Sequence, residues 1–334
     1  MPWVKGWRAR ILSPTCLSRW DNRPRSEGSE RFSMPAAFDH PYLDLARMEM
    51  LRRCRLLPRG TAEGSFAGPH RSRFRGTAVE FADYRQYVPG DDIRLIDWKV
   101  VARADKYYIK LYEAERNLLS HLLIDSSGSM EYAGAVTRTE SKLAYASRLA
   151  AALAYLVVDQ GDQVGLSLCS DRLQDHLRAG AGWTHLAALV ARLGQAKASG
   201  DTDLGHCMGE IFSRSSKRGV VVIFSDFLGI DESFWRGVDL FRRTHNDVLL
   251  FQVLHPEELE LPELSVARFI DCEGSGGSFT AEVDVVRQSY AAAIKAHLDL
   301  VQAGAATRGC EYYLARTDFD PYPFLKSCLL GRVR

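Results

Sequence analysis

The stretch that decides the fold is Leu118–Ser129, which reads Leu-Leu-Ser-His-Leu-Leu-Ile-Asp-Ser-Ser-Gly-Ser. Its apolar part, which ends at Ile124, is typical of a strand that is covered on both faces of a parallel sheet. Its polar part places Asp125, Ser127 and Ser129 at the carboxyl end of that strand, where ligands gather in open α/β sheets. A loop that offers only oxygen ligands suits a hard divalent cation. The alternative is a plain turn, because Asp, Ser and Gly are common turn formers.

From residue 117 onward, strand patterns and helix patterns alternate along the chain. This alternation predicts an α/β fold: a doubly wound, mostly parallel sheet of Rossmann type with helices on both faces. The expected strands are 118–124, 163–169, 173–177 (an edge strand), 219–225, 247–254 and 311–315. The expected helices are 141–160, 183–193, 204–213, 233–244 and 283–308. The glycine-rich stretch 274–277 reads as a hairpin turn.

Two further polar positions fall where they could join the first cluster. Asp226 directly follows the apolar run 220–224, and Thr202 lies in a polar loop that opens a helix. Each has an ordinary explanation, since Asp226 can simply end a strand and Thr202 can cap a helix. Strands far apart in sequence can be neighbours in a doubly wound sheet, so we expect these side chains to converge with Asp125, Ser127 and Ser129. Two carboxylates and three hydroxyls suit Mg²⁺ or Mn²⁺.

At this point the sequence resembles two known patterns. Asp125-x-Ser127-x-Ser129, with Thr202 and Asp226, is similar to the metal-ion-dependent adhesion site of the von Willebrand factor A fold. From about residue 41 to the C-terminus the chain resembles the bacterial domain of unknown function 58. That resemblance is carried by an upstream string with the residues Arg85, Tyr87, Pro89, Gly90, Asp91, Asp92, Arg94, Asp97 and Trp98, followed by Arg103.

The resemblance implies binding rather than catalysis. In such sites one metal position stays open, and a Glu or Asp of a protein partner fills it. The resemblance implies that Asp125 coordinates mostly through water and that Ser127 and Ser129 coordinate directly, while Thr202 and Asp226 complete the shell. Members of the family often accompany a MoxR-type AAA+ ATPase, so we expect an adaptor in complex assembly or maturation.

The upstream string has two interpretations. It is either a partner surface, built by Arg85, Arg94, Asp97, Trp98 and Arg103, or a network that packs a small strand segment. The planar fork of the arginine guanidinium suits both.

The expected organisation has three parts. Residues 1–40 read as a flexible leader, with Met34 as an alternative native start. Residues 41–116 hold a helix over 41–57, strands at 78–84 and 107–112, and the family string. Residues 117–334 form the von Willebrand factor A-like domain.

Composition limits the other function classes. The seven cysteines are single and form no Cys-x-x-Cys pair, which argues against disulfides and zinc and suits a reducing cytoplasm. No apolar run is long enough to span a bilayer. Residues 1–116 carry 22 Lys and Arg against 15 Asp and Glu, but without aromatic interleaving, so we expect no nucleic-acid partner.

The alternative function is a Mg²⁺-dependent hydrolase or phosphatase that uses the same Asp/Ser site. An aspartyl-nucleophile phosphatase normally has a second Asp two residues after the first, and this chain has Ser127 there. The serine-hydrolase elbow and the phosphate-binding loop are also absent from the sequence.

Overall fold

The structure is a computed structural model. It describes residues 9–11, 40–56, 58, 79–88, 91, 93, 96–98, 100–101, 107–114, 118–214, 218–271 and 277–332. The contacts divide the chain into two units, one of residues 1–61 with 118–334 and one of residues 62–117. The sequence pattern predicted that 41–57 belongs with the strand-rich segment, whereas in the structure this stretch belongs to the unit that contains the large sheet.

The smaller unit contains an antiparallel pair of strands. These are β2 (Val79–Gln86) and β3 (Tyr108–Ala114), and their register shifts between Phe81 and Asp83. Both strands lie where the sequence pattern predicts them, within two residues at each end.

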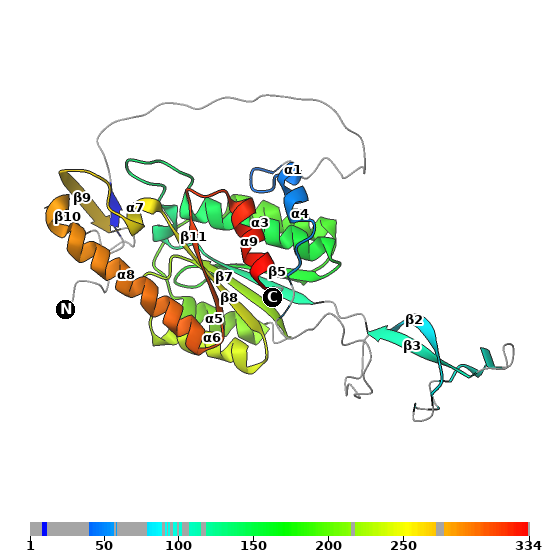
Figure 1. Cartoon of the computed structure of the whole chain (residues 1–334). Helices are drawn as coiled ribbons and strands as arrows, with labels where there is room; N and C mark the ends of the chain where they lie inside the picture. Colours follow the sequence, from blue (N-terminus) through cyan, green and yellow to red (C-terminus); the bar gives the residue numbers. More distant parts are fainter. Residues whose placement is uncertain are drawn as a thin grey trace, which may run out of the picture. The chain divides into compact units, whose positions relative to one another are not determined.

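The larger unit is built on a six-stranded sheet with helices on both faces (Figure 1). In spatial order its strands are β11 (Glu311–Arg316), β8 (Asp247–Leu254), β7 (Gly219–Ser225), β4 (Leu119–Asp125), β5 (Gln163–Cys169) and β6 (Leu173–Gly180). All neighbours are parallel except β6, which pairs antiparallel with β5 at the edge. The predicted mixed α/β fold with a mostly parallel central sheet is confirmed.

Alternating side chains of the central strands point into two separate cores. In β4, Leu122 and Ile124 enter one core and Leu123 the other, as a sheet buried on both faces requires. The first core is covered by α3 (Lys142–Asp159), α4 (Trp183–Gln195) and α9 (Pro321–Arg332). The second is covered by α5 (Leu204–Arg214), α6 (Glu232–Arg243) and the C-terminal half of α8 (Val283–Thr307).

The predicted helix over 41–57 is much shorter in the structure. It begins at α1 (Leu45–Met48), where the Asp44 carboxylate accepts hydrogen bonds from two backbone N–H groups, and it ends after the 3₁₀ turn η2 (Glu49–Leu51). Leu51, Cys54 and Leu56 are all buried in the first core. This spacing does not match one helical face, so tertiary packing overrides the local pattern.

Helix α9 and three strands of the larger unit were not predicted. Helix α9 carries a weak apolar pattern. Strands β9 (Val266–Asp271) and β10 (Ser278–Glu282) form the hairpin implied by the turn at 274–277, of which only Gly277 lies within the described residues. Strand β1 (Ala9–Ile11), inside the predicted leader, pairs antiparallel with β9.

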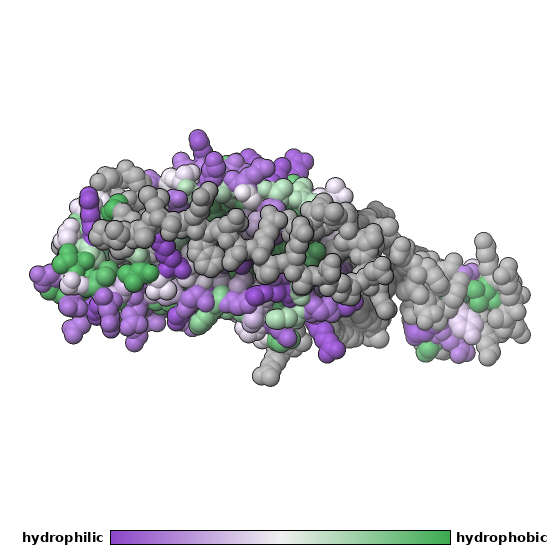
Figure 2. Space-filling view, turned by 90° about the horizontal axis from the view of Figure 1, so that it is seen from above, coloured by the Kyte–Doolittle hydropathy of each residue, from purple (hydrophilic) through white to green (hydrophobic). Residues whose placement is uncertain are grey.

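The three-stranded sheet of β1, β9 and β10 leaves apolar side chains exposed. Figure 2 shows hydrophobic residues at the end of the larger unit that carries β9, β10 and the start of α8. The exposed apolar residues of these elements are Val266, Phe279 and Val285. Among the helices of the described residues, none is both long and apolar enough to cross a membrane.

Candidate metal centre

The order of the strands explains why the predicted residues meet. The chain leaves β4 toward β5 on one side and later returns to β7 on the other side of β4. Ligands bind beyond the carboxyl ends of strands at such a switch point. Ile124 pairs with Phe224, so Asp125 of β4 and Ser225 of β7 follow side by side at this edge.

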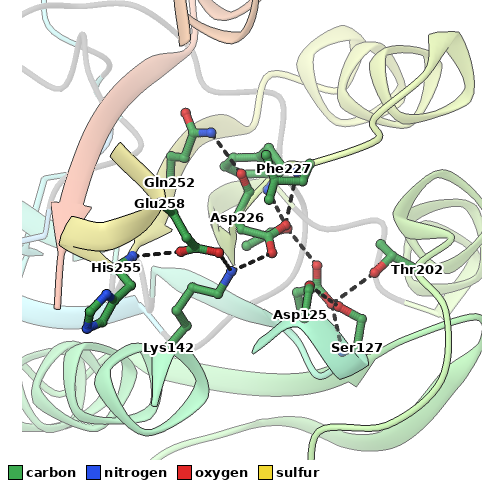
Figure 3. A network of polar contacts seen from close by, with 12 residues as sticks. Asp125, Ser127, Lys142, Thr202, Asp226, Phe227, Gln252, His255 and Glu258 are labelled. Atoms are coloured by element: carbon green, nitrogen blue, oxygen red, sulfur yellow. Dashed lines mark hydrogen bonds and ion pairs between the residues drawn. The ribbon is translucent and has the colours of Figure 1, made fainter. Parts of the chain in front are cut away.

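Asp125 is fully buried, and both of its oxygens accept hydrogen bonds (Figure 3). Oδ1 accepts from the backbone N–H of Ser127 at 2.9 Å and from the hydroxyl of Thr202 at 3.4 Å. Oδ2 accepts from the hydroxyl of Ser225 at 2.6 Å. The turn after β4, the loop that carries Thr202 and the end of β7 are therefore connected through one carboxylate.

The remaining hydroxyls of the predicted set lie in the same place. Ser127 Oγ is 3.1 Å from Ser129 Oγ, and both residues are buried at the start of the 3₁₀ helix η4 (Gly128–Glu131). Backbone hydrogen bonds hold the loop that carries Thr202 against this turn: Gly128 N–H donates to Gly200 O, and Ser199 N–H donates to Ser126 O.

Asp226 follows β7 in an unusual stretch of backbone. Its Oδ1 accepts from Leu228 N–H at 3.0 Å, and its carbonyl accepts from the Gln252 side chain at 2.8 Å. The next residue, Phe227, has a φ of 54°, which is uncommon for a bulky side chain and concentrates at functional sites. Ser225 Oγ accepts the Phe227 N–H at 2.9 Å and so helps to hold this conformation.

The two carboxylates influence each other. Burial raises the pKa of Asp125, and the charge of Asp226 raises it further, against the lowering effect of the hydrogen bonds from Ser225 and Ser127. Nearby like charges in a desolvated site disfavour ionisation. A cation at this edge would offset that repulsion.

One cation is already part of the site. Lys142 is fully buried, and its Nζ lies 2.9 Å from Asp226 Oδ2 and 2.6 Å from Glu258 Oε1. Burial alone would lower the pKa of Lys142, but Asp226 and Glu258 outweigh it and raise the pKa. Glu258 belongs to the short helix α7 (Pro256–Leu259) that follows β8.

Lys142, Ser225 and Glu258 also belong to this cluster, and the sequence pattern did not predict them as site residues. A signal for Lys142 exists, because it stands in the first turn of α3, directly after the N-cap Ser141. A cation there opposes the helix dipole, so a strong local reason is needed to keep it. Glu258 gives no comparable signal, since its partner is 116 residues away.

The donor chemistry of the edge fits a hard cation. Among the described residues there is no group of three or more His, Cys, Asp or Glu side chains that could hold a metal ion, and this edge of the sheet contributes two carboxylates, those of Asp125 and Asp226. The predicted set contains only carboxylate and hydroxyl oxygens, the ligand type that Mg²⁺ prefers.

The predicted upstream string is only partly within the described residues. Arg85 pairs with Asp91 at 2.8 Å, and the ring of Tyr87 meets the ring of Tyr107 edge-on. Asp97 is buried, and Trp98 is 63% exposed. The ion pair and the ring contact are what a packing network predicts. The exposed Trp98 is what a partner surface predicts. Asp92, Arg94 and Arg103 lie outside the described residues.

Fold and site together define the class: an α/β protein with a mostly parallel sheet and an oxygen-rich polar cluster at its switch point. Residues 83–299 match the family described as "Protein of unknown function DUF58", and the chain belongs to this family. The predicted membership is confirmed.

Relatives and solved structures add the following similarities. The uncharacterized protein Rv1480 of Mycobacterium tuberculosis is 30% identical over 276 residues, which cover 81% of this chain and 84% of that protein. The uncharacterized protein MAV169 of Mycobacterium avium is 31% identical over 119 residues, 35% of this chain and 69% of that protein. BatB of Bacteroides thetaiotaomicron is 14% identical, with a TM-score of 0.40 over 65% of this chain and 97% of that one. An aerotolerance-related membrane protein of Bacteroides fragilis is 16% identical, with a TM-score of 0.40 over 65% and 98%.

Proposed function

We propose that the larger unit is a von Willebrand factor A-like, non-enzymatic protein-interaction module that depends on a bound divalent cation. The ion is Mg²⁺ or Mn²⁺, and its ligands are Asp125, Ser127, Ser129, Thr202 and Asp226. The observation that carries the proposal is the hydrogen bonding of Asp125 to both Ser127 and Thr202, next to Asp226, at the switch point of the sheet.

Charge supports the same proposal. Asp125, Asp226 and Glu258 carry three negative charges, and Lys142 supplies one positive charge, so the fully ionised cluster has a net charge of −2. Burying unbalanced charge is costly. A divalent cation neutralises the cluster, and a carboxylate from a partner completes the coordination of the ion.

The partner is a protein that offers an acidic side chain, and we propose a MoxR-type AAA+ ATPase in the cytoplasm. A surface hollow of about 510 Å³ between α5 and α6 begins at Asp203, one residue after Thr202. Arg236 and Arg243 line it. Asp203 and Asp239 line it as well, so the hollow offers charges of both signs to the polar side chains of a partner whose carboxylate reaches the ion.

Calorimetry with the metal alone tests the ion site. The purified full chain is titrated with MgCl₂ and MnCl₂, and Asp125→Asn is compared with Asp201→Asn, an exposed carboxylate in the neighbouring loop. We expect saturable binding that Asp125→Asn abolishes and Asp201→Asn keeps, with unchanged circular dichroism. Equal binding by both variants would contradict the site.

Two further measurements test the function. Binding to a purified MoxR-type ATPase from the same organism is measured with Mg²⁺ and with EDTA. Binding that is reduced neither by EDTA nor by Asp125→Asn would contradict the adaptor role. Incubation with phosphate esters and Mg²⁺ tests the hydrolase alternative. Turnover that disappears in Asp125→Asn would replace the binding module with an enzyme.

A further inference from the structure

Lys142 is the least expected residue of the site. Lysine is almost never fully buried unless it is paired, and here the ammonium is held between Asp226 and Glu258, one carboxylate from each side (Figure 3). Only Asp226 belongs to the proposed metal ligands. The ammonium therefore contacts one of the oxygens on which the metal would depend.

The two carboxylates that hold Lys142 differ in what else fixes them. Glu258 Oε2 accepts the backbone N–H of His255 at 2.8 Å, and the Glu258 carbonyl accepts the hydroxyl of Tyr290 from α8 at 2.7 Å. Glu258 is thus anchored by α7 and α8, away from the proposed ligands. It offers the ammonium a partner that persists when Asp226 is engaged elsewhere.

The second oxygen of Asp226 has its own donor. Leu228 N–H donates to Oδ1 at 3.0 Å, and Lys142 binds Oδ2 at 2.9 Å. A divalent ion that binds Asp226 therefore shares Oδ1 with a backbone N–H group or Oδ2 with an ammonium. An ammonium and a metal ion on one carboxylate repel each other, and this repulsion is strong in a buried site.

We propose that Lys142 is a built-in counter-ion that competes with the divalent cation for Asp226, and that Glu258 limits this competition by holding the ammonium. The inference rests on the proposed metal site and adds its regulation. Metal affinity is then set by the balance between Asp226 and Glu258 for one ammonium. Any movement of α7 that breaks the Lys142–Glu258 ion pair strengthens the Lys142–Asp226 ion pair and lowers the affinity for the divalent cation.

Metal titrations of single variants give the first test. MgCl₂ or MnCl₂ alone is titrated by calorimetry into the full chain, Lys142→Met and Glu258→Gln, with the exposed Lys197→Met and Glu260→Gln as matched controls. We expect affinity at least about tenfold higher in Lys142→Met and about tenfold lower in Glu258→Gln, and no change in the controls.

The double variant Lys142→Met with Glu258→Gln separates competition from simple charge. It keeps the net charge of the wild-type cluster, so a sum of long-range charges predicts unchanged affinity. Competition predicts tighter binding, because Asp226 has lost its rival cation. This variant also leaves one fewer unpaired buried carboxylate than Lys142→Met, so it serves if the single variant does not fold.

The outcomes distinguish the two proposals. If wild type, Lys142→Met and the double variant all fail to bind metal, the ion site is wrong and this inference falls with it. If wild type binds through Asp125 but the folded double variant binds no more tightly, the ion site stands and the competition is wrong. Tighter binding by the double variant, seen also as a larger Mg²⁺-induced rise of its Tm, supports the competition.

Discussion

The hydroxyl of Ser225 donates a 2.6 Å hydrogen bond to Asp125 Oδ2 and joins the carboxyl ends of two adjacent strands, β7 and β4. The same hydroxyl oxygen accepts the N–H of Phe227, whose φ is 54°. One buried serine therefore orients a proposed metal ligand and fixes the backbone that follows Asp226.

Replacing this serine should affect both stability and metal binding. Ser225→Ala leaves a carboxylate oxygen and a buried N–H without their partner, so we expect a loss of about 1–3 kcal/mol in the free energy of unfolding. Because the serine orients a ligand, Mg²⁺ affinity should fall about tenfold or more. Urea unfolding and calorimetry measure the two effects.

Ser126→Ala is the matched control for this prediction. Ser126 is also buried, but its hydroxyl donates to a backbone carbonyl, that of Cys169, at 3.0 Å. We expect a stability loss in this variant without a change in Mg²⁺ affinity. Equal affinities in Ser225→Ala and Ser126→Ala would show that Ser225 does not orient the ligand.

The strands of the sheet, and the part of the site that lies directly at its edge, could be predicted from the sequence. The strands buried on both faces are continuous apolar runs, and polar residues directly after β4 and β7 must lie at the same sheet edge. Asp125 and Asp226 could therefore be predicted to converge. The loop residue Thr202 could be added because its helix, α5, begins at the same edge.

The rest of the site depends on tertiary contacts that leave little local signal. Lys142 and Glu258 are 116 residues apart. Glu258 forms a capping box with His255 at the start of α7, but that local motif does not indicate Lys142 as a partner. The short helix α1 and the turn after Leu51 follow the shape of the core rather than a helical period. Helix α9 was missed because its apolar residues do not form one clear stripe.

Glu257 should contribute strongly to stability at neutral pH. Its carboxylate accepts from Tyr132 Oη and from the N–H groups of Ala135, Val136 and Thr137. Burial alone would raise the pKa of Glu257, but these hydrogen bonds outweigh it and lower the pKa. Glu257→Gln turns an amide N–H₂ toward these donors, so we expect a loss of about 2–3 kcal/mol at pH 7 by urea unfolding.

The pH dependence gives this prediction a second readout. A carboxylate with a lowered pKa in the folded state adds stability above its unfolded pKa, and loses it as the pH falls through the folded value. The difference between wild type and Glu257→Gln should therefore shrink below about pH 4.5. The exposed Glu260→Gln should show neither effect, and a constant difference from pH 7 to 3 would contradict the assignment.

His121 should make the protein less stable as the pH falls. It is buried in β4 with Nε2 at 2.9 Å from Ser167 Oγ, and burial and then the neighbouring His176 lower the pKa of His121 to about 3. Between pH 3 and pH 6.5 the unfolded chain binds a proton that folded His121 does not, so stability falls with falling pH by up to about 1.4 kcal/mol per unit.

A comparison of variants isolates this effect from the acidic groups. His121→Leu should flatten the stability profile between pH 6.5 and 4, while the exposed His206→Gln should keep the wild-type slope. Asp125 and Glu258 are present in wild type, His121→Leu and His206→Gln. Their titration therefore cancels when the stability of one protein is subtracted from that of another. A slope that is unchanged in His121→Leu would show that the folded and unfolded states bind the His121 proton alike, which would contradict the lowered pKa.

Two glycines of the second layer of helices should respond oppositely to alanine. A Cβ at Gly304 of α8 would lie 2.3 Å from the ring of Trp235 in α6, whereas a Cβ at Gly209 of α5 meets nothing within 4 Å. Gly304→Ala must therefore push α8 off α6, and we expect a loss of about 1–3 kcal/mol. Gly209→Ala should add up to about 1 kcal/mol, because alanine favours the helix. Thermal unfolding of the pair checks both signs, and a neutral Gly304→Ala would mean that α8 does not pack on α6 at this contact.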